Sequence, residues 1–345
     1  MKIGSTELKY GLMLAPMAGY TDRAMRMVCK GFGAEYTVTE MVSARAVVYN
    51  DKKTFSLAKI MEDEGPVAVQ IFGSEPDIMA EAARVLSGPC RIGSEYPGST
   101  IPQSEIKYIA PRAIDINMGC PVKKIFSNGE GSALMRDPGL IERITSAVKR
   151  ATSLPVTVKI RAGINEKSIN AVDCAKAAEA AGASAVCIHG RTTAQMYGGL
   201  ADRKIIEKVK NCLQIPVIAN GDIVDGASAA AMLLETGADG IAIGRGAVGN
   251  PFIFSEILAG LSGSEWRAPT LAERAEAALL QLKLACEDKG EAYAIPEARK
   301  QIAAYLRAFR GAARIRARIN SAVTLAEIKE AFDELLLSEN GGYSL

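Results

Sequence analysis

The sequence has few of the residues that build disulfide frameworks and structural zinc sites. Its seven cysteines are spread from Cys29 to Cys286 and include no C-x-x-C pair. An odd number of cysteines without paired spacing argues against both kinds of site. We therefore expect no bound metal, and we expect most of the thiols to be small buried hydrophobic groups.

A strong net charge and a long apolar run are also missing. The formal net charge is only +2, so no chain-wide basic field indicates a nucleic acid, and any such partner needs a local basic patch. No apolar run approaches the roughly 18 to 20 residues that cross a bilayer, and the first residues, broken by glycine, do not resemble a signal peptide. These absences predict a cytoplasmic protein that does not enter a membrane.

What the chain does contain is a repeated alternation of short apolar runs and helical stretches. The runs cover residues 12–16, 36–41, 67–72, 113–118, 156–161, 185–190, 216–221 and 239–244. Runs this apolar suit strands that are buried on both faces, and eight is the number of strands that closes a parallel barrel. The sequence therefore predicts an α/β fold, with a (β/α)8 TIM barrel over residues 1–262. A doubly wound open sheet is the alternative.

Two segments interrupt the alternation. Residues 88–111 are rich in Gly, Pro and Ser and lie between the third helix and the fourth strand. This connection belongs at the N-terminal face of a barrel, away from the chemistry, so we expect a surface insertion there. Near the C-terminus the strands stop, and helical patterns cover 271–290, 296–319 and 324–338. They predict a small all-helical C-terminal domain over residues 263–345.

Enzymes built on this barrel hold their working residues at the carboxyl ends of the strands. The predicted strand ends carry polar, basic and glycine residues that a purely structural strand end does not need. They are Pro16, Met17, Ala18, Glu40, Gln70, Asn117, Cys120, Lys159, Arg161, His189, Arg191, Asn220, Gly221, Asp222, Gly244 and Arg245. We expect them to meet at one mouth of the barrel and to bind an anionic ligand with many hydrogen-bonding atoms.

The ends of the seventh and eighth strands indicate what kind of anion is bound. Asn220-Gly221-Asp222 ends the seventh run and Gly244-Arg245 ends the eighth. The loops after these two strands are the usual phosphate site of TIM barrels, because glycine lets backbone N–H groups approach phosphate oxygens and arginine adds charge. The alternative is that these glycines only serve tight turns.

Three further residues suit a redox cofactor. A flavin gains negative charge at its N1–C2 edge on reduction, and the ammonium of Lys159 would stabilise that charge. The amide of Gln70 offers a donor and an acceptor to the N3–C4 edge. His189, the only histidine of the chain, ends the sixth strand. We expect it to contact the cofactor, with a structural role as the alternative.

Cys120 lies just past the fourth strand and is followed by Pro121. The proline disfavours helical angles at Cys120 and keeps the loop extended, so that the thiol can project into the mouth. A thiol with a pKa of about 8.5 is mostly protonated at neutral pH and can act as a general acid. A nucleophile and an inert packing group are the alternatives, and a nucleophile would have to use His189 as its base.

Together these residues resemble the tRNA-dihydrouridine synthase family over nearly the whole chain. Seven motifs carry the resemblance, in order along the chain and at the matching strand ends. They are Leu14-Ala15-Pro16-Met17-Ala18-Gly19, Gln70-Ile71-Phe72-Gly73, Asn117-Met118-Gly119-Cys120-Pro121, Val158-Lys159-Ile160-Arg161, His189-Gly190-Arg191-Thr192, Asn220-Gly221-Asp222 and Gly244-Arg245. The segment from Asp115 to Pro121 looks closest to the bacterial branch of the family.

The resemblance implies FMN as cofactor, NADPH as reductant and uridine in tRNA as substrate. By position it implies that FMN is held by Pro16, Met17, Ala18, Gln70, Lys159, Asn220, Gly221, Asp222, Gly244 and Arg245, to which we add His189. It also implies that hydride from the flavin goes to C6 of the uracil ring while Cys120 protonates C5. Asn117 and Arg191 are the predicted substrate contacts in the pocket, since the amide of Asn117 can both donate and accept.

A basic stretch in the helical domain suits an RNA backbone. Residues 298–326 contain no acidic residue, and Arg307, Arg310 and Arg314 have the i, i+3, i+7 spacing of one helical face. Two lysines just after Cys120 extend the positive path. The predicted backbone contacts are Arg307, Arg310, Arg314, Lys123 and Lys124. Such contacts leave the choice of base to the pocket.

Two other functions remain open from the sequence. One is an FMN barrel that reduces or oxidises a free pyrimidine, in the manner of dihydroorotate dehydrogenases, which leaves the basic stretch without a role. The other is a tRNA-binding protein without catalysis. For a synthase, the sequence does not predict which uridine of tRNA is modified.

Overall fold

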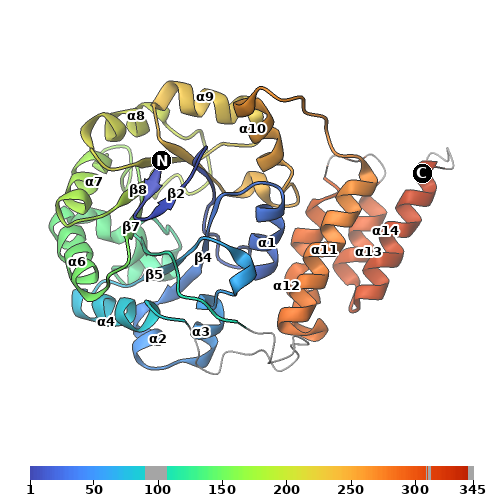
Figure 1. The fold of residues 1–345 in the computed structure, drawn as a ribbon, viewed down its shortest axis with the longest axis horizontal. Helices are drawn as coiled ribbons and strands as arrows, with labels where there is room; N and C mark the ends of the chain where they lie inside the picture. The colour runs from blue at the N-terminus through green and yellow to red at the C-terminus, as the bar shows by residue number, and fades with distance from the viewer. Residues whose placement is uncertain (90–106, 308, 310–311, 341–345) are drawn as a thin grey trace.

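In the computed structural model, which describes residues 1–89, 107–307, 309 and 312–340, eight parallel strands close into a barrel (Figure 1). They follow one another around it in sequence order, and β10 pairs with β3 to close the ring. The strands are β3 (Leu12–Leu14), β4 (Tyr36–Ser43), β5 (Val67–Phe72), β6 (Ala113–Asn117), β7 (Val156–Arg161), β8 (Ala185–His189), β9 (Val217–Asn220) and β10 (Gly240–Ile243). The predicted TIM barrel and its eight strands are confirmed.

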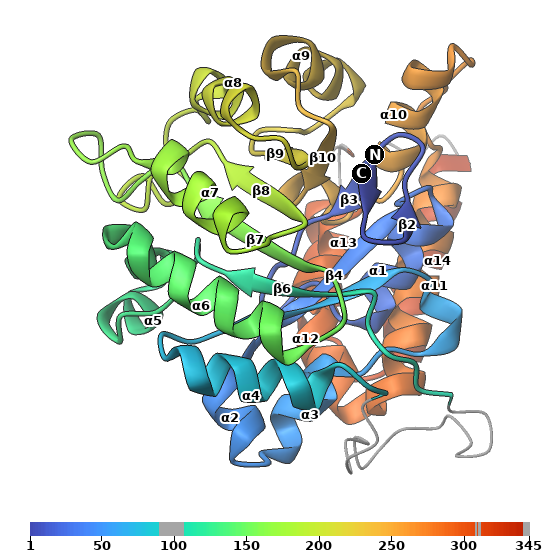
Figure 2. The ribbon, with the colours of Figure 1, turned by 60° about the vertical axis from the view of Figure 1, so that its left-hand side comes forward.

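Helices cover the outside of the barrel between the strands, as the alternation predicted (Figure 2). The longer ones are α1 (Arg23–Gly31), α4 (Pro76–Leu86), α6 (Pro138–Ala151), α7 (Ala171–Ala180), α8 (Arg203–Cys212), α9 (Gly226–Thr236) and α10 (Ile253–Ser262); the short ones are α2 (Ala44–Val48), α3 (Lys52–Ala58) and α5 (Lys123–Ser127). Their ends follow local rules. Pro138 starts α6, where a missing N–H costs nothing, and Gly237 ends α9 in the left-handed region with a φ of 62°.

The inside of the barrel is an apolar core built largely from small side chains. Five alanines are buried there with Met13, Tyr36 and Ile218, namely Ala15, Ala68, Ala113, Ala185 and Ala242. A much larger apolar layer lies between the strands and the outer helices. Because alanines occupy so much of the interior, polar side chains from β6 and β7 have room to enter it.

An N-terminal hairpin that the sequence pattern did not predict closes the end of the barrel at which the strands begin. It consists of β1 (Lys2–Ile3) and β2 (Thr6–Glu7), and it buries Ile3 in the interior core. Gly4 makes the turn with a φ of 59°, and a Cβ on it would overlap Cγ of Pro155. Only glycine therefore fits this close approach. The hairpin covers the amino ends of the strands and leaves the carboxyl ends as the open mouth.

The C-terminal region is helical, as predicted, and lies beside the barrel (Figure 1). It contains α11 (Leu271–Lys289), α12 (Glu291–Ala304), α13 (Ala313–Ser321) and α14 (Leu325–Asn340), which enclose a separate apolar core. Helix α11 packs against α1 of the barrel. The proposed division of the chain between residues 262 and 263 stays a prediction, although α10 ends at Ser262.

Buried ion pairs join the helical region to the barrel. Nζ of Lys59 lies 2.6 Å from Asp288, and both side chains are buried. Nζ of Lys289 lies 2.7 Å from Asp22 in the loop before α1. Breaking such a pair would leave a buried charge without a partner, which is strongly destabilising. These contacts therefore hold the helical region in one orientation against the barrel.

The long helix predicted over residues 296–319 is wrong. Helix α12 begins earlier, at Glu291, and ends at Ala304, and α13 begins only at Ala313. Between them the side chains of Tyr305 and Leu306 are completely buried, and the Tyr305 hydroxyl donates to Gln281 at 2.7 Å. The chain leaves the helical path because burying these two side chains in the helical core outweighs helix propensity.

The predicted surface insertion over residues 88–111 lies mostly outside the described residues, and Cys90 lies outside them as well. At its described end, Tyr108 pairs with Met61 in an antiparallel bridge, and the N–H of Ile109 donates to Ile60 at 3.0 Å.

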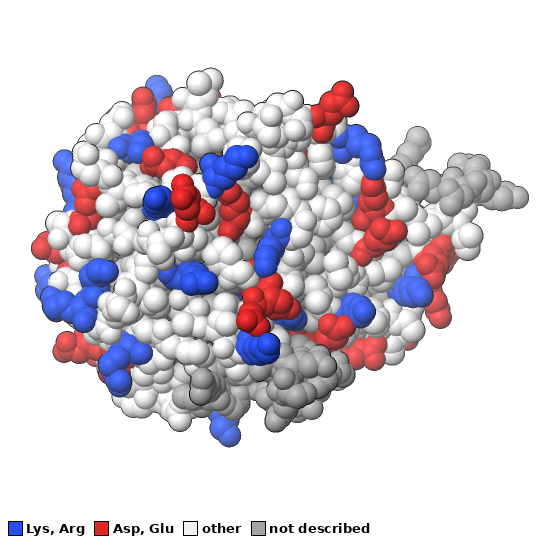
Figure 3. Space-filling view, viewed as in Figure 1, with Lys and Arg blue, Asp and Glu red and all other residues white. Residues whose placement is uncertain are grey.

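Charge is mixed over the molecule. On the face shown in Figure 3, lysine and arginine side chains alternate with aspartate and glutamate, and no field of one sign covers that face. None of the helices in the described ranges is long and apolar enough to cross a membrane. Among the same residues, no cluster of three or more His, Cys, Asp or Glu side chains is arranged to hold a metal ion.

Candidate active site at the mouth of the barrel

The carboxyl ends of neighbouring strands bring predicted site residues side by side. Asn117 on β6 lies opposite Lys159 on β7, and Arg161 on β7 lies opposite His189 on β8. His189 in turn faces Asn220 on β9. Alternate residues of each strand point inward, so these side chains meet inside the mouth.

Cys120 lies on a loop that hydrogen bonds hold from both sides. Oδ1 of Asn117 accepts the backbone N–H groups of Gly119 at 3.2 Å and of Cys120 at 2.9 Å. Ser132 donates its own N–H and its hydroxyl to the carbonyl of Cys120, at 3.0 and 2.9 Å. The half-buried thiol is therefore presented by a rigid backbone.

The environment of Cys120 favours a protonated sulfur. Burial raises the pKa of the thiol above its usual value, against the opposing effects of the Val122 N–H and of the Arg161 and Lys159 cations. A raised pKa keeps the thiol protonated at neutral pH. Among the three roles considered for Cys120, this state suits a general acid better than a thiolate nucleophile.

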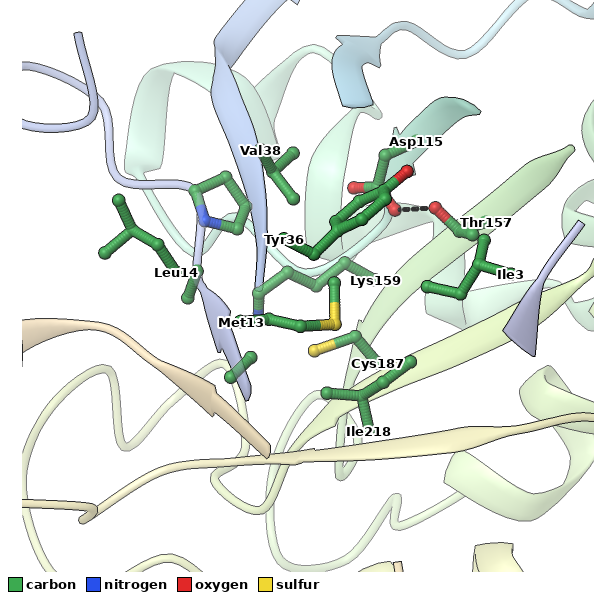
Figure 4. Close-up of a pocket in the computed structure, with 13 residues that line it drawn as sticks. Ile3, Met13, Leu14, Tyr36, Val38, Asp115, Thr157, Lys159, Cys187 and Ile218 are labelled. Carbon is green, nitrogen blue, oxygen red and sulfur yellow. Dashed lines mark hydrogen bonds between the residues drawn. The ribbon is translucent and has the colours of Figure 1, made fainter. Parts of the chain in front are cut away.

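Asn117 is held by a chain of buried polar groups whose far end sequence reasoning missed. Its Nδ2 donates to Oε1 of Gln70 at 2.8 Å, and Nε2 of Gln70 donates to Asp115 at 2.6 Å. The Thr157 hydroxyl donates to the second carboxylate oxygen (Figure 4). Burial raises the pKa of Asp115, although the Gln70 and Thr157 hydrogen bonds oppose this. The one sequence signal for Asp115 is an acidic residue in an otherwise apolar strand.

Lys159 reaches the mouth from β7 and is oriented by Asn220. Its Nζ donates to Oδ1 of Asn220 at 2.9 Å, while Nδ2 of Asn220 donates to the carbonyl of Ala242 at 2.6 Å. Lys159 also lines a cavity in the barrel together with Pro16 and Cys187 (Figure 4). Asn220 thus acts on the ammonium, and its predicted contact with the cofactor stays a prediction.

His189 is buried and neutral. Burial, followed by the cations of Lys159 and three arginines, lowers its pKa to about 2, so the imidazole carries no charge at physiological pH. Gly221 packs directly against it. Its φ is 120°, and a Cβ there would lie 2.7 Å from Ala201 and 2.9 Å from the ring of His189. This close approach explains the glycine at the end of β9 without reference to a phosphate.

A buried arginine to which the sequence assigned no individual role braces the mouth. Arg161 is 3% exposed and donates to the carbonyls of Gly119 at 2.8 Å, Thr192 at 2.9 Å and Met196 at 2.9 Å. Burial lowers its pKa to about 10, so it stays protonated at neutral pH. Arg161 therefore ties the Cys120 loop to the loop after β8.

Arg191 also holds a loop and is not free for a substrate. It is 2% exposed and donates to the carbonyls of Gly198 at 3.0 Å and Gly199 at 2.6 Å. Its guanidinium lies 2.7 Å from Asp222. Because these groups occupy it and burial closes it off, the structure does not support the predicted substrate contact of Arg191.

The loops after β9 and β10 present one exposed cation. Although burial acts to raise the pKa of Asp222, the N–H of Ala201 and the guanidinium of Arg191 lower it below its usual value. Arg245 lies 3.9 Å from Asp222, and its guanidinium is 4.8 Å from the centre of the Tyr197 ring. Its side chain is 55% exposed. It is thus the arginine of the mouth that an anion can reach.

The turn after β3 completes the mouth. The backbone N–H of Met17 donates to the Thr21 hydroxyl at 3.0 Å, and the carbonyl of Met17 accepts the N–H of Tyr20 at 3.0 Å. Pro16 and Met17 are half-buried and Ala18 is exposed. The Glu40 carboxylate accepts the N–H of Gly19, so this strand-end acid braces a turn.

Comparison with known proteins identifies the family. The family model described as dihydrouridine synthase matches residues 13–89 and 106–340. This chain belongs to the dihydrouridine synthase family. It is 38% identical over 340 residues to a probable tRNA-dihydrouridine synthase of Rickettsia conorii, in a match that covers 98% of this chain and 97% of the relative. It is 40% identical over 323 residues to tRNA-dihydrouridine synthase B of Pseudomonas putida, with 93% and 90% covered. The predicted resemblance is confirmed.

The match also bears on the expected insertion. The dihydrouridine synthase model leaves out residues 90–105, which fall inside the segment predicted as an insertion. The helical region, in contrast, is matched as far as residue 340.

The predicted basic face of this synthase-family chain is wrong. Arg307 lies in the turn after α12 and Arg314 lies on α13, so no single helix carries both. Arg310 lies outside the described residues. Arg314 and Arg318 both form ion pairs with Glu334 on α14, whereas Arg307 is exposed.

Other cations lie nearer the mouth. Lys123 and Lys124 are exposed on α5, directly after the Cys120 loop. On the helical side, Lys300 is exposed and lies 6.0 Å from the ring centre of Tyr20 in the β3–α1 loop. Lys300 falls within the basic stretch predicted over residues 298–326, but the sequence did not place it at the junction with the barrel.

Proposed function

We propose that this protein is a tRNA-dihydrouridine synthase, which reduces the C5–C6 double bond of uridines in tRNA with FMN as cofactor and NADPH as reductant. The family match and the names of the relatives support the reaction and the substrate. Within the site, one observation carries the proposal: the rigidly held Cys120 thiol, protonated at neutral pH, at the mouth of the barrel. Action on tRNA agrees with the predicted cytoplasmic location.

The donor groups of the mouth suit FMN. Asn220 holds the ammonium of Lys159, which would neutralise the charge of the reduced ring at its N1–C2 edge. Each polar atom of the Gln70 amide keeps one further hydrogen-bonding position for the N3–C4 edge. Arg245 is the exposed cation for the phosphate. The residues proposed to hold FMN are Pro16, Met17, Ala18, Gln70, Lys159, His189, Asn220, Gly221, Asp222, Gly244 and Arg245. When bound, FMN supplies the hydride that is added at C6.

Cys120 supplies the proton that completes the reduction. After hydride is added at C6 of the uracil ring, negative charge collects toward C5 and O4, and the Sγ–H of Cys120 protonates C5. The Arg161 and Lys159 cations, which act to lower the thiol pKa, stabilise the thiolate that remains. A solvent proton then restores the thiol.

Asn117 and the surface cations are proposed to place the substrate. The Nδ2 group of Asn117 also points at the sulfur of Met41, at 3.5 Å, and this weak acceptor can give way to a uracil oxygen. The cations proposed for the tRNA backbone are Lys123, Lys124, Lys300, Arg307 and Arg310, and Arg314 contributes less because it pairs with Glu334. Their contacts are expected to weaken as salt rises.

Replacing Cys120 tests the proposal. Cys120→Ala is expected to keep the flavin absorbance and its bleaching by NADPH, and to lose about 10²- to 10⁴-fold of product formation, the range of general-acid effects. The assay is mass spectrometry of dihydrouridine formed on tRNA from cells that lack the modification. Cys120→Ser, a matched control of similar shape and weaker acidity, should be nearly as inactive. Unchanged product formation by Cys120→Ala would rule out Cys120 as the proton donor.

The same assay separates the main rival. Protein reduced with NADPH is expected to be reoxidised by unmodified tRNA and not by uracil, uridine or orotate. Equal reoxidation by a free pyrimidine would replace the proposal with a reductase of small substrates. Binding of tRNA by a protein that holds no flavin would indicate a binding protein instead.

A further inference from the structure

We infer that Asp115 is a positioning residue: its carboxylate dictates the orientation of the Gln70 and Asn117 amides and, through them, of the loop that carries Cys120. The inference rests on the proposed function only for its effect on catalysis. The hydrogen bonds themselves are independent of any cofactor or substrate.

The direction of each bond follows from the carboxylate. Both oxygens of Asp115 accept a hydrogen bond, one from the Thr157 hydroxyl and the other from Nε2 of Gln70 at 2.6 Å. Two accepting oxygens are typical of an ionised carboxylate, and such a carboxylate turns Nε2 of Gln70 toward itself. This leaves Oε1 of Gln70 facing β6, where it accepts from Nδ2 of Asn117 at 2.8 Å. Oδ1 of Asn117 is then the atom that meets the N–H of Cys120, at 2.9 Å.

Flipping either amide would place like groups against each other. A flipped Asn117 would aim its Nδ2 hydrogens at the N–H groups of Gly119 and Cys120, and its Oδ1 would face Oε1 of Gln70. Asp115, Gln70 and Asn117 are 5%, 1% and 8% exposed. Water therefore has little access to hydrogen-bond the groups that a flip would leave facing each other. In a buried chain of this kind, one end decides the orientation of every member.

The buried position of Asp115 supports a role in orienting the Gln70 and Asn117 amides. A carboxylate inside an apolar barrel destabilises the fold unless hydrogen bonds compensate it. Thr157 donates to its other oxygen from the neighbouring strand (Figure 4). Of the two donors to Asp115, only Gln70 is hydrogen-bonded to Asn117 and so connects the carboxylate to the mouth. Three hydrogen bonds in series thus connect the buried carboxylate on β6 to the backbone N–H of Cys120.

Asp115→Asn tests the inference, because an asparagine of the same shape can donate as well as accept. Gln70 then loses its forced orientation, and the Cys120 loop is expected to sample more than one arrangement. In FMN-loaded protein, alkylation of Cys120 by iodoacetamide is followed by peptide mass spectrometry between about pH 6 and pH 10. We expect Cys120 to react about fivefold faster, with a lower midpoint pH, and kcat to fall roughly tenfold at unchanged KM for tRNA.

Thr157→Val is the matched control. It removes the other hydrogen bond to Asp115 at nearly constant volume and leaves the carboxylate that orders the amides. We expect alkylation of Cys120 and kcat to stay within about twofold of the unmodified protein. If Thr157→Val alters them as much as Asp115→Asn, or if Asp115→Asn alters neither, the inference is overturned.

A reversed pair covers the case in which Asp115→Asn does not fold. Asp115→Asn combined with Asn117→Asp moves the carboxylate to the other end of the chain of hydrogen bonds. The whole chain can then run in the opposite direction, while the new carboxylate at position 117 still accepts the Cys120 N–H. We expect the alkylation profile of Cys120 to return to within about twofold of the unmodified protein, and a folded double variant without this return overturns the inference. If the unmodified protein forms no dihydrouridine, the proposed function fails while the alkylation comparison still decides this inference.

Discussion

The arginines of the barrel mouth and those of the helical region are used in opposite ways. Arg161 and Arg191 are buried, and each donates to at least two backbone carbonyls of loops around the mouth. Arg314 and Arg318 have side chains that are 61% and 41% exposed and share one partner, Glu334. The buried pair are structural braces inside a functional site, whereas the exposed pair are largely neutralised. Charge alone therefore does not show which cations meet a ligand.

Their energetic weights differ for the same reason. Removing a buried guanidinium with several charge-assisted hydrogen bonds leaves the carbonyls that accepted them without donors, which destabilises the fold. An exposed ion pair contributes about 0–1 kcal/mol and is screened by salt. The cations left to contact a ligand are the ones with accessible heads, such as Arg245 at the mouth and Lys300 at the junction.

Replacing one arginine by lysine in each region should change dihydrouridine formation very differently. Arg161→Lys keeps the charge but loses the planar fork that reaches Gly119, Thr192 and Met196. We expect dihydrouridine formation to fall about 100-fold, because the Cys120 loop loses its brace and a small misplacement is costly. Arg314→Lys should change it less than about twofold. Equal losses, measured by the same tRNA assay, would contradict the contrast between the two regions.

The pH dependence of stability should arise at the mouth, since the helical region contains no histidine. His189 has a pKa of about 2 in the folded protein and about 6.5 when unfolded. The unfolded chain thus binds a proton first, so stability is complete above about pH 6.5 and falls as the pH drops below it. We expect a loss of about 1.4 kcal/mol between pH 7.5 and 5.5 from this group.

Urea unfolding at about pH 7.5 and 5.5 measures this loss. Acidic residues also titrate, so His189→Gln is the reference for their contribution. The difference between the two proteins in pH response is the quantity that matters. An identical response would show that His189 is not held neutral by its burial and by the cations of the mouth.

The smallest effect is expected in the helical region. Glu334→Ala releases Arg314 and Arg318, so tRNA affinity at low salt should rise about two- to fivefold, with a steeper salt dependence. Filter binding across a salt series measures both. Glu330→Ala removes the same charge from an exposed position of α14 and controls for the general effect of charge. If both variants bind alike, Glu334 does not mask these arginines.

Much of the architecture was predictable because it depends on local pattern. Eight apolar runs with helical stretches between them predicted β3 to β10, and strand ends predicted the mouth residues. Pro121 singled out Cys120 as a projecting thiol. The hairpin at Lys2–Glu7 escaped prediction because each of its strands has only two residues. The helix break after Ala304 escaped it because Tyr305 is buried by partners far away in the sequence.

The barrel, the helical region, the family and the set of polar strand ends could be inferred from the sequence alone, since each of these is encoded in residues close together along the chain. The roles of those strand-end residues could be assigned only from their contacts in the folded protein. Arg191 became a buried brace, Asn220 became the partner of Lys159, and Asp115 came to lead a hydrogen-bonded chain toward Cys120. These roles depend on which neighbour lies across the barrel and on the burial it imposes, and the contacts that create them join residues 31 to 61 positions apart.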